Sequence, residues 1–215
     1  MRIQILALIL MAIGCKAPNR QNQNTPKLND GMRVSEFLGE TLVRDGQVGS
    51  IIIHGTCNAH GFILENLHAN TIDKSSDVES TLKTVVAAND QLKYSRDQDG
   101  IWRILDRNAS TDLLQEKLPS LAIKSFSSNH AVAQLLNSPE VDSYVKEHAI
   151  IMAPSFGGLG PVNPSALPFD LLNIHESTLA GELDQIAQHY QGVWVYRECL
   201  RDDGRGAIDV HIFEK

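Results

Sequence analysis

The segment Val193–Cys199, with the sequence VWVYREC, is the most strand-like stretch of this chain, and the arrangement of its neighbours follows from it. β-Branched and aromatic residues favour extended backbone. The pair Asp203-Gly204 is typical of a tight turn, so Ala207–Phe213 is predicted to return as the second strand of a hairpin. In that returning strand the apolar residues share one face, whereas Asp209 and His211 share the other. This alternation predicts a sheet with one dry face and one wet face.

A helix is predicted directly before this hairpin. Its apolar residues recur at helical spacing: Leu179, Leu183, Ile186, Ala187 and Tyr190. Ser177 is expected to cap the helix, and Gly192 is expected to end it at the C′ position. Phe169–Ile174 reads as one more strand. Residues 169–215 are therefore predicted to form a unit of helix plus hairpin.

Residues 32–126 are predicted to form a first unit of the same kind. A helical stripe over 33–44 ends at Gly46, and the β-branched run over 48–55 predicts a buried strand. Ser76 or Asp77 is expected to cap a helix that runs to about residue 88. The remaining predicted elements are a hairpin over 92–96 and 101–105 around Asp99-Gly100, and a strand over 118–126.

Residues 127–168 are predicted to connect the two units. Ser128 is expected to cap a helix to Leu136, and Pro139 is expected in the first turn of a second helix. Pro154–Pro168 is rich in proline and glycine and predicts a long loop. The expected fold class is α+β, with small sheets packed on helices.

The two units share a tetrapeptide as well as an order of elements. Glu-Ser-Thr-Leu occurs at residues 79–82 and again at 176–179, near the start of each predicted helix. An internal duplication and a chance recurrence are both compatible with this pattern.

The first residues of the chain predict export. Arg2 is followed by an apolar run that is too short to span a bilayer and that ends at Gly14 and Cys15. The segment MAIGC at 11–15 resembles the lipobox of bacterial lipoproteins. This resemblance implies that residues 1–14 are a signal peptide and that Cys15 carries a diacylglycerol. Residues 15–31 are then expected to tether a folded body to the membrane, on the periplasmic side of the outer membrane.

A second resemblance lies in the last unit. Its helix and strand resemble the short N-terminal domain shared by secretins and TonB-dependent receptors, through Leu179, Leu183, Ile186, Ala187, Gly192, Val193 and Val195. The resemblance implies a periplasmic α+β module that docks against other proteins or against itself. A pore or transport role is not part of this expectation.

Three cysteines are present. If Cys15 is lipidated, Cys57 and Cys199 remain as an even pair, and such pairs usually oxidise in exported proteins. A bridge between them would close a loop of about 143 residues, which stabilises by ~4–5 kcal/mol in the entropic model. Two separate buried thiols are the alternative.

Only one tight cluster combines side chains that bind metals. His54, Cys57 and His60 follow one another at intervals of three residues, but the sequence shows no second pair of ligands nearby. A polar strand end, with Cys57 in a disulfide, is the other interpretation. No metal or other cofactor is therefore expected.

Catalytic signals are weak elsewhere. Asp209 could orient His211 as a base, although a cross-strand charge pair is the commoner reason for such a pair, and His175 precedes the last helix. The sequence contains no G-x-S-x-G, H-E-x-x-H or P-loop motif. The formal net charge of −7 also argues against a nucleic-acid partner.

The function expected from these features is non-catalytic. The chain reads as a lipid-anchored interaction or assembly module of the cell envelope that binds another envelope protein. Trp194 and Tyr196 share one strand face, and they are either core residues or the contact for that partner. A metal-dependent envelope hydrolase and a small-ligand carrier are the alternatives.

Overall fold

The computed structural model describes residues 33–58, 62–68, 77–152 and 170–215. The predicted leader, Cys15, the tether, His60 and the loop over 154–168 lie outside these ranges. The described elements in chain order are α1 Val34–Arg44, β1 Gly49–Cys57, β2 Ile63–Glu65, α2 Val78–Ala88, β3 Leu92–Arg96, β4 Trp102–Asp106, the 3₁₀ helix η1 Leu113–Gln115, β5 Lys117–Leu118, β6 Leu121–Ser125, α3 Ser128–Leu136, α4 Pro139–Glu147, β7 Ile151–Met152, β8 Asp170–Ile174, β9 Ser177–Thr178, α5 Leu179–Tyr190, β10 Val193–Leu200 and β11 Gly206–Phe213.

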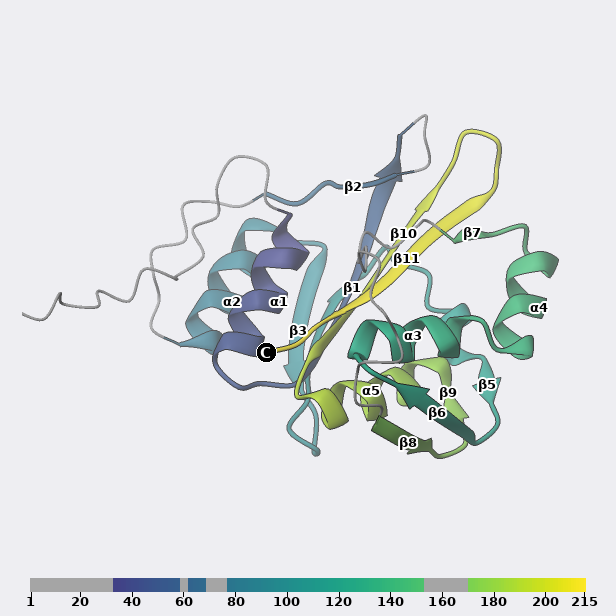
Figure 1. Ribbon diagram of the computed structural model, residues 1–215. Coiled ribbons are helices and arrows are strands. Elements are labelled where there is room, and N and C mark those ends of the chain that lie inside the picture. The colour runs from purple at the N-terminus through teal and green to yellow at the C-terminus, as the bar shows by residue number, and fades with distance from the viewer. Residues whose placement is uncertain (1–32, 59–61, 69–76, 153–169) are drawn as a thin grey trace, which may run out of the picture.

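A mixed sheet lies at the centre of the molecule (Figure 1). Its strand order is β3-β4-β1-β10-β11-β7, and β2 pairs with the end of β1. β1 runs parallel to β4 on one side and to β10 on the other. The hairpins β3–β4 and β10–β11 are antiparallel, as their turn residues predict. The α+β fold class is therefore confirmed, and β1 joins the two hairpins into one sheet.

Two smaller sheets lie beside the central one. β5 pairs with β9, and β6 pairs with β8. Each pair joins a strand from before α3 with a strand from after α4, so the two ends of the connector are held together. Within the described ranges, none of the helices is long and apolar enough to cross a bilayer.

Helices cover both faces of the central sheet. Val193 and Val195 of β10 pack into a core with α1 and α2. Trp194 and Tyr196 point the other way, into a core with α3 and α5. Such a strand is buried on both faces, which explains its nearly continuous apolar sequence. The prediction of a wet face is wrong, because α1 packs against this hairpin and Asp209 is only 5% exposed.

The helix starts follow the predicted chemistry with small shifts. The Asp77 carboxylate accepts the Ser80 amide at 2.8 Å and caps α2, as predicted. For α3 the cap is Ser127, one residue before the predicted Ser128. For α5 the cap is Thr178, because the predicted Ser177 pairs with Leu118 in the β5–β9 sheet.

The shared tetrapeptide occupies different places in the two units. Residues 79–82 lie inside α2, which begins at Val78, whereas residues 176–179 reach α5 only at Leu179. The order of helix, strand and strand recurs, but the tetrapeptide does not mark equivalent positions. It therefore lends no support to a duplication.

The end of α5 depends on two neighbouring residues. Gln191 takes the left-handed conformation, with φ at 55°, so Gly192 is not needed for that purpose. Gly192 instead lies against β11, where a Cβ atom would meet the Phe213 carbonyl oxygen at 2.4 Å. The glycine is required because the helix end and the last strand approach closely.

Replacing Gly192 tests this close approach. We expect Gly192→Ala to lower the free energy of unfolding by roughly 1–3 kcal/mol, the usual cost of overpacking. Gly206→Ala is the matched control, since a Cβ there has its nearest neighbour at 3.5 Å. Urea unfolding monitored by circular dichroism gives both values. Equal stability of the two variants would contradict the explanation.

Candidate functional site

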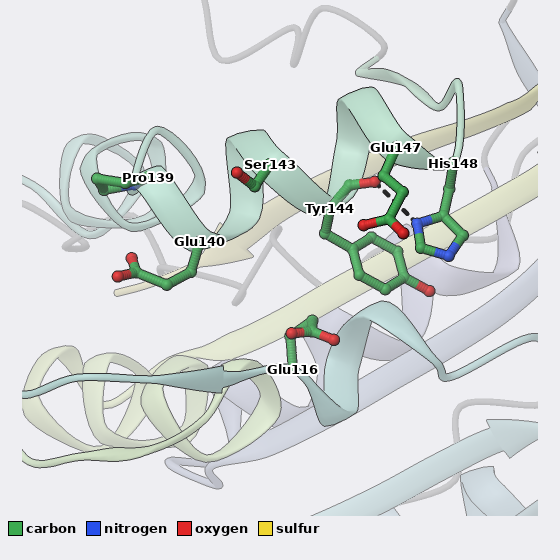
Figure 2. Close-up of a pocket in the computed structure, with 7 residues that line it drawn as sticks. All are labelled: Glu116, Pro139, Glu140, Ser143, Tyr144, Glu147 and His148. Carbon is green, nitrogen blue, oxygen red and sulfur yellow. Dashed lines mark hydrogen bonds between the residues drawn. The ribbon is translucent and has the colours of Figure 1, made fainter.

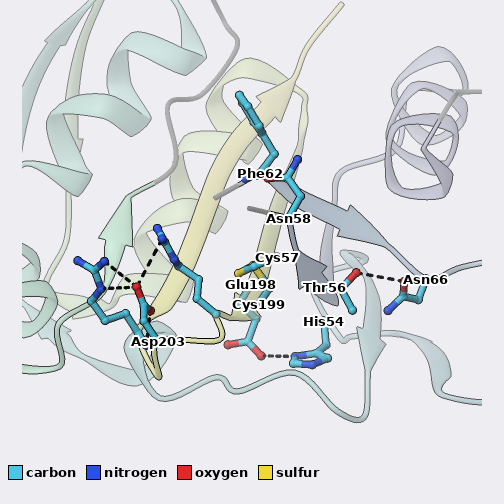
Figure 3. Close-up of a disulfide and its surroundings, with 11 residues drawn as sticks. His54, Thr56, Cys57, Asn58, Phe62, Asn66, Glu198, Cys199 and Asp203 are labelled. Carbon is cyan, nitrogen blue, oxygen red and sulfur yellow. Dashed lines mark hydrogen bonds and ion pairs between the residues drawn. A yellow bond between two sulfur atoms is a disulfide. The ribbon is translucent and has the colours of Figure 1, made fainter. Parts of the chain in front are cut away.

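A disulfide joins Cys57 at the end of β1 to Cys199 near the end of β10 (Figure 3). The two Cα atoms are 5.4 Å apart, although 142 positions separate the residues in sequence. The pairing predicted from the cysteine count is present. It fastens the ends of two parallel strands that already lie side by side.

His54 and Cys57, two of the three candidate metal ligands, have other partners in the structure. The sulfur of Cys57 is bonded to Cys199, so it cannot serve as a thiolate ligand. His54 faces Glu198, with its Nδ1 atom 3.0 Å from the Glu198 Oε1 atom. The described residues contain no group of three or more His, Cys, Asp or Glu side chains that could hold a metal ion. Cys57 is therefore in the disulfide that the alternative interpretation assigned to it, and His60 lies outside the described residues.

His54 belongs instead to a polar contact at the carboxyl ends of the parallel strands. Glu198 also accepts the backbone amide of Ser110 at 2.6 Å. The His54 amide lies 3.4 Å from the Asp106 carboxylate at the end of β4. One carboxylate from each neighbouring strand thus contacts β1. These contacts hold the segment after β4 against the sheet.

Trp194 and Tyr196 are core residues. They are 1% and 2% exposed, so neither side chain is available to a partner. The indole nitrogen of Trp194 donates to the Asp184 carboxylate at 2.7 Å, which satisfies the polar end of the ring inside the molecule. Burial raises the pKa of Tyr196. The structure thus shows the core interpretation rather than the partner contact.

The Asp184 carboxylate anchors a network that the sequence analysis missed. Arg103 of β4 donates to both Asp184 oxygens, at 2.6 and 2.7 Å, and also contacts Asp97. Burial opposes the charge on Arg103, but the two carboxylates outweigh burial and raise its pKa. A charged residue between Trp102 and Ile104 was the available signal, since it marks the other face of that strand.

The second missed group is a buried ion pair on the α1 side of the sheet. Arg197 of β10 lies directly opposite Asp209 of β11, and its Nε atom donates to the Asp209 carboxylate at 2.9 Å. The Glu65 carboxylate is 3.6 Å from the Arg197 guanidinium. Glu65 also accepts the Ser35 amide at 3.0 Å, so the group connects the sheet to the start of α1.

Asp209 is a structural carboxylate in this arrangement. Burial would raise its pKa, but the hydrogen bond with His211 and the charge of Arg197 outweigh burial and lower the pKa. The His211 Nδ1 atom is 3.4 Å from the same oxygen that Arg197 binds. The cross-strand charge pair is therefore what the structure shows, with Arg197 as the partner. This charge pair gives no support to a role of His211 as a general base.

His175 lies apart from the other histidines. Its backbone amide and carbonyl both bond to the Gln185 side chain, at 2.9 and 3.1 Å, and the residue is exposed. His54, His175 and His211 therefore occupy three separate surroundings. No shared site joins them in the described structure.

An acidic depression lies between η1 and α4 (Figure 2). Its volume is about 630 Å³, and its lining consists of Glu116, Pro139, Glu140, Ser143, Tyr144, Glu147 and His148. In Figure 2 Glu140 and Tyr144 lie on α4 above Glu116, and their side chains point to opposite sides. Charges brought together from η1 and α4 were not visible in the sequence, because nothing in the local pattern pairs the two segments.

A buried carboxyl group lies close to this depression. Glu182 of α5 is 0% exposed, and neither of its carboxylate oxygens has a hydrogen-bond partner among the described residues. Burial and, to a lesser extent, the charge of Glu140 raise the pKa of Glu182 to about 7. One oxygen of Glu140 is also buried without a partner. The two carboxyl groups therefore form an uncompensated acidic pair.

Comparisons with known proteins add no relative to this picture. Models of protein families, curated proteins and solved structures were each searched, and none matched the chain. The lipobox resemblance and the resemblance to the secretin short domain therefore stay predictions.

The buried ion pair predicts that removing its cation costs more stability than neutralising one of its carboxylates. Arg197→Met leaves Asp209 and Glu65 buried without their cation, and we expect a loss of roughly 3–5 kcal/mol in unfolding free energy. Asp209→Asn should cost less, because Arg197 still faces Glu65 and the amide oxygen can still accept its hydrogen bond. Urea unfolding at pH 7 measures both. A larger loss for Asp209→Asn would contradict the assignment.

The Glu182 carboxyl group predicts a pH dependence. Its ordinary pKa of 4.5 applies to the unfolded chain, whereas the folded value is about 7. The folded state therefore binds more protons across this window, and the unfolding free energy should fall as the pH rises from 4.5 to 7. Glu182→Gln should flatten this slope, whereas the exposed control Glu176→Gln should keep it. Urea midpoints at several pH values decide between these outcomes.

Proposed function

We propose that this chain is an exported envelope protein, anchored by lipid on Cys15, whose folded part acts as an interaction module. The membrane would be one partner, through the anchor. Another envelope protein would be the second partner, through the surface of the folded part.

The disulfide between Cys57 and Cys199 carries the proposal. Disulfides persist in oxidising compartments such as the bacterial periplasm and are rare in the cytosol. The bridge uses two of the three cysteines in the chain. Cys15 is the third, and it stands directly after the apolar run, where a lipobox places its modified residue.

The start of α1 is where the proposed tether would join the fold. The Ser35 amide and hydroxyl both donate to Glu65, so α1 begins next to β2, in which Ile63 pairs with Cys57. About 17 residues separate Cys15 from Arg33, and a chain of that length reaches at most ~60 Å. An anchor at Cys15 would therefore keep the start of α1 within that reach of the bilayer.

The acidic depression favours contact with a partner over storage of a small ligand. Carrier pockets enclose their ligands and are lined mainly by apolar side chains. The depression between η1 and α4 is open and is lined largely by charged and polar side chains. A group that protrudes from a larger molecule fits such a surface.

Replacing the proposed lipid-bearing residue tests the anchor. We expect Cys15→Ser to abolish both the incorporation of labelled palmitate and the recovery of the protein in the membrane fraction. Thiol labelling of the wild-type membrane fraction should find Cys57 and Cys199 oxidised.

The matched control is the double variant Cys57→Ser with Cys199→Ser. It should lose stability and still carry the lipid, because neither cysteine takes part in anchoring. Recovery of the wild-type protein from the cytosol with Cys57 and Cys199 reduced would contradict the proposal.

A further inference from the structure

Two of the exposed leucines in the described ranges lie on the same face of the central sheet. Leu64 of β2 is 49% exposed, and Leu200 of β10 is 67% exposed. Leu64 pairs directly with Thr56 of β1, so both side chains point to one face. Thr56 follows His54 by two residues and therefore shares its face. Leu200 follows Glu198 in the same way, and Glu198 contacts His54 on that face.

Leu64, Thr56 and Leu200 thus form a row across three neighbouring strands, which we call the leucine row. Among the described elements, no helix packs over it. On the same face, Trp194 and Tyr196 enter the core with α3 and α5, but the leucine row lies beyond that core. Figure 1 shows the ends of β1 and β2 and the β10–β11 hairpin projecting past the helices. Single exposed apolar residues are normal, whereas adjacent ones mark a contact surface.

The predicted tether joins the fold beside the leucine row. The Ser35 amide and hydroxyl both donate to Glu65, the residue after Leu64, so the start of α1 is held against β2. About 17 residues separate Cys15 from Arg33, and a chain of that length reaches at most ~60 Å. A lipid on Cys15 would confine the row within that reach of a bilayer. Such confinement raises the effective concentration, so a weak apolar contact is enough.

The charges next to the row do not oppose contact with lipid head groups. In the turn after Leu200, Arg201 and Arg205 both face Asp203, at 3.4 and 2.7 Å. Together with Asp202, the turn carries two positive and two negative charges, hence no net charge. The whole chain carries −7, so this end of the sheet is less acidic than the average of the chain. Anionic head groups therefore meet little repulsion here.

The small size of the leucine row favours a bilayer over a folded partner. A specific protein interface takes about 800 Å² from each side, which two leucines and one threonine do not supply. A bilayer surface accepts even a few inserted apolar side chains, because the lipid anchor already supplies most of the affinity. Insertion of the row would then decide which end of the folded part lies on the membrane.

We propose that Leu64 and Leu200 insert into the bilayer that holds the lipid on Cys15, so that the ends of β1, β2 and β10 lie against the membrane. Such a contact requires the lipid anchor, and this inference therefore rests on the proposed function. It deepens that proposal, because it makes lipid the partner of this sheet face and orients the folded part.

Quenching of tryptophan fluorescence by brominated lipid tests the contact. The lipidated full chain is reconstituted in phosphatidylcholine vesicles with or without bromine on the upper acyl chains. Interfacial side chains reach that depth, so Leu200→Trp should lose about half of its added fluorescence. Leu171→Trp is the matched control and should lose little, because Leu171 is 65% exposed on β8, far from the hairpin end (Figure 1). Trp102 and Trp194 are buried, and wild-type protein gives their signal for subtraction.

A charged neighbour gives a second measurement. Leu64→Glu, added to the Leu200→Trp chain, should remove most of the quenching, because an ionised carboxylate resists transfer into an apolar medium. Leu171→Glu, added to the same chain, should leave the quenching unchanged. Both leucines are exposed, so neither change should unfold the protein, and circular dichroism checks this.

Flotation of the vesicles separates this inference from the anchor on which it rests. Wild-type chain that fails to float with the vesicles overturns the anchor and the contact together. Chain that floats without quenching of Leu200→Trp, or with equal quenching of Leu171→Trp, overturns the contact alone. A dimer that forms without quenching and dissociates on Leu64→Glu also overturns it, and assigns the leucine row to a second copy.

Discussion

The parallel pairing of β1 with β10 is the interaction on which the rest of the structure depends. It brings residues 49–54 next to 193–198 and so joins the two hairpins into one sheet. Because β10 then lies inside the sheet, helices can cover both of its faces, with α1 and α2 on one side and α3 and α5 on the other. The apolar side chains of VWVYREC have no other place where both sets could be buried at once.

The carboxylates of the described structure fall into two groups, those with a cation beside them and those without one. Arg197 faces Asp209 and Glu65 inside the fold, and Arg103 faces two aspartates, so each of these buried or half-buried carboxylates has a cation beside it. The carboxylates between η1 and α4 have none among the described residues. Compensated charges hold elements together, whereas uncompensated charges near a surface cost stability.

Local patterns predicted local structure well. Gly46, Asp77 and Asp99-Gly100 act through the backbone within a few residues, so the helix and hairpin limits nearly match the structure. Contacts between distant segments were beyond such patterns. Asp209 reads as a solvent-facing residue until Arg197 and α1 are placed over it. The charge of Glu140 on α4 acts on Glu182 of α5 only through the tertiary fold. The cysteine pair was predictable because counting does not depend on knowing the topology.

The strand order also determines at which stage of protein synthesis the central sheet can form. β1 spans Gly49–Cys57, so it is synthesised well before its neighbour β10, which spans Val193–Leu200. Until residue 198 arrives, β1 can pair only with β4 and β2, and one of its long edges stays open. Strands that lie far apart in sequence pair slowly, because the chain loses the entropy of loop closure before the new contacts stabilise it. A partly synthesised copy of this protein therefore exposes an unpaired edge of β1, which other chains could contact until β10 pairs with it.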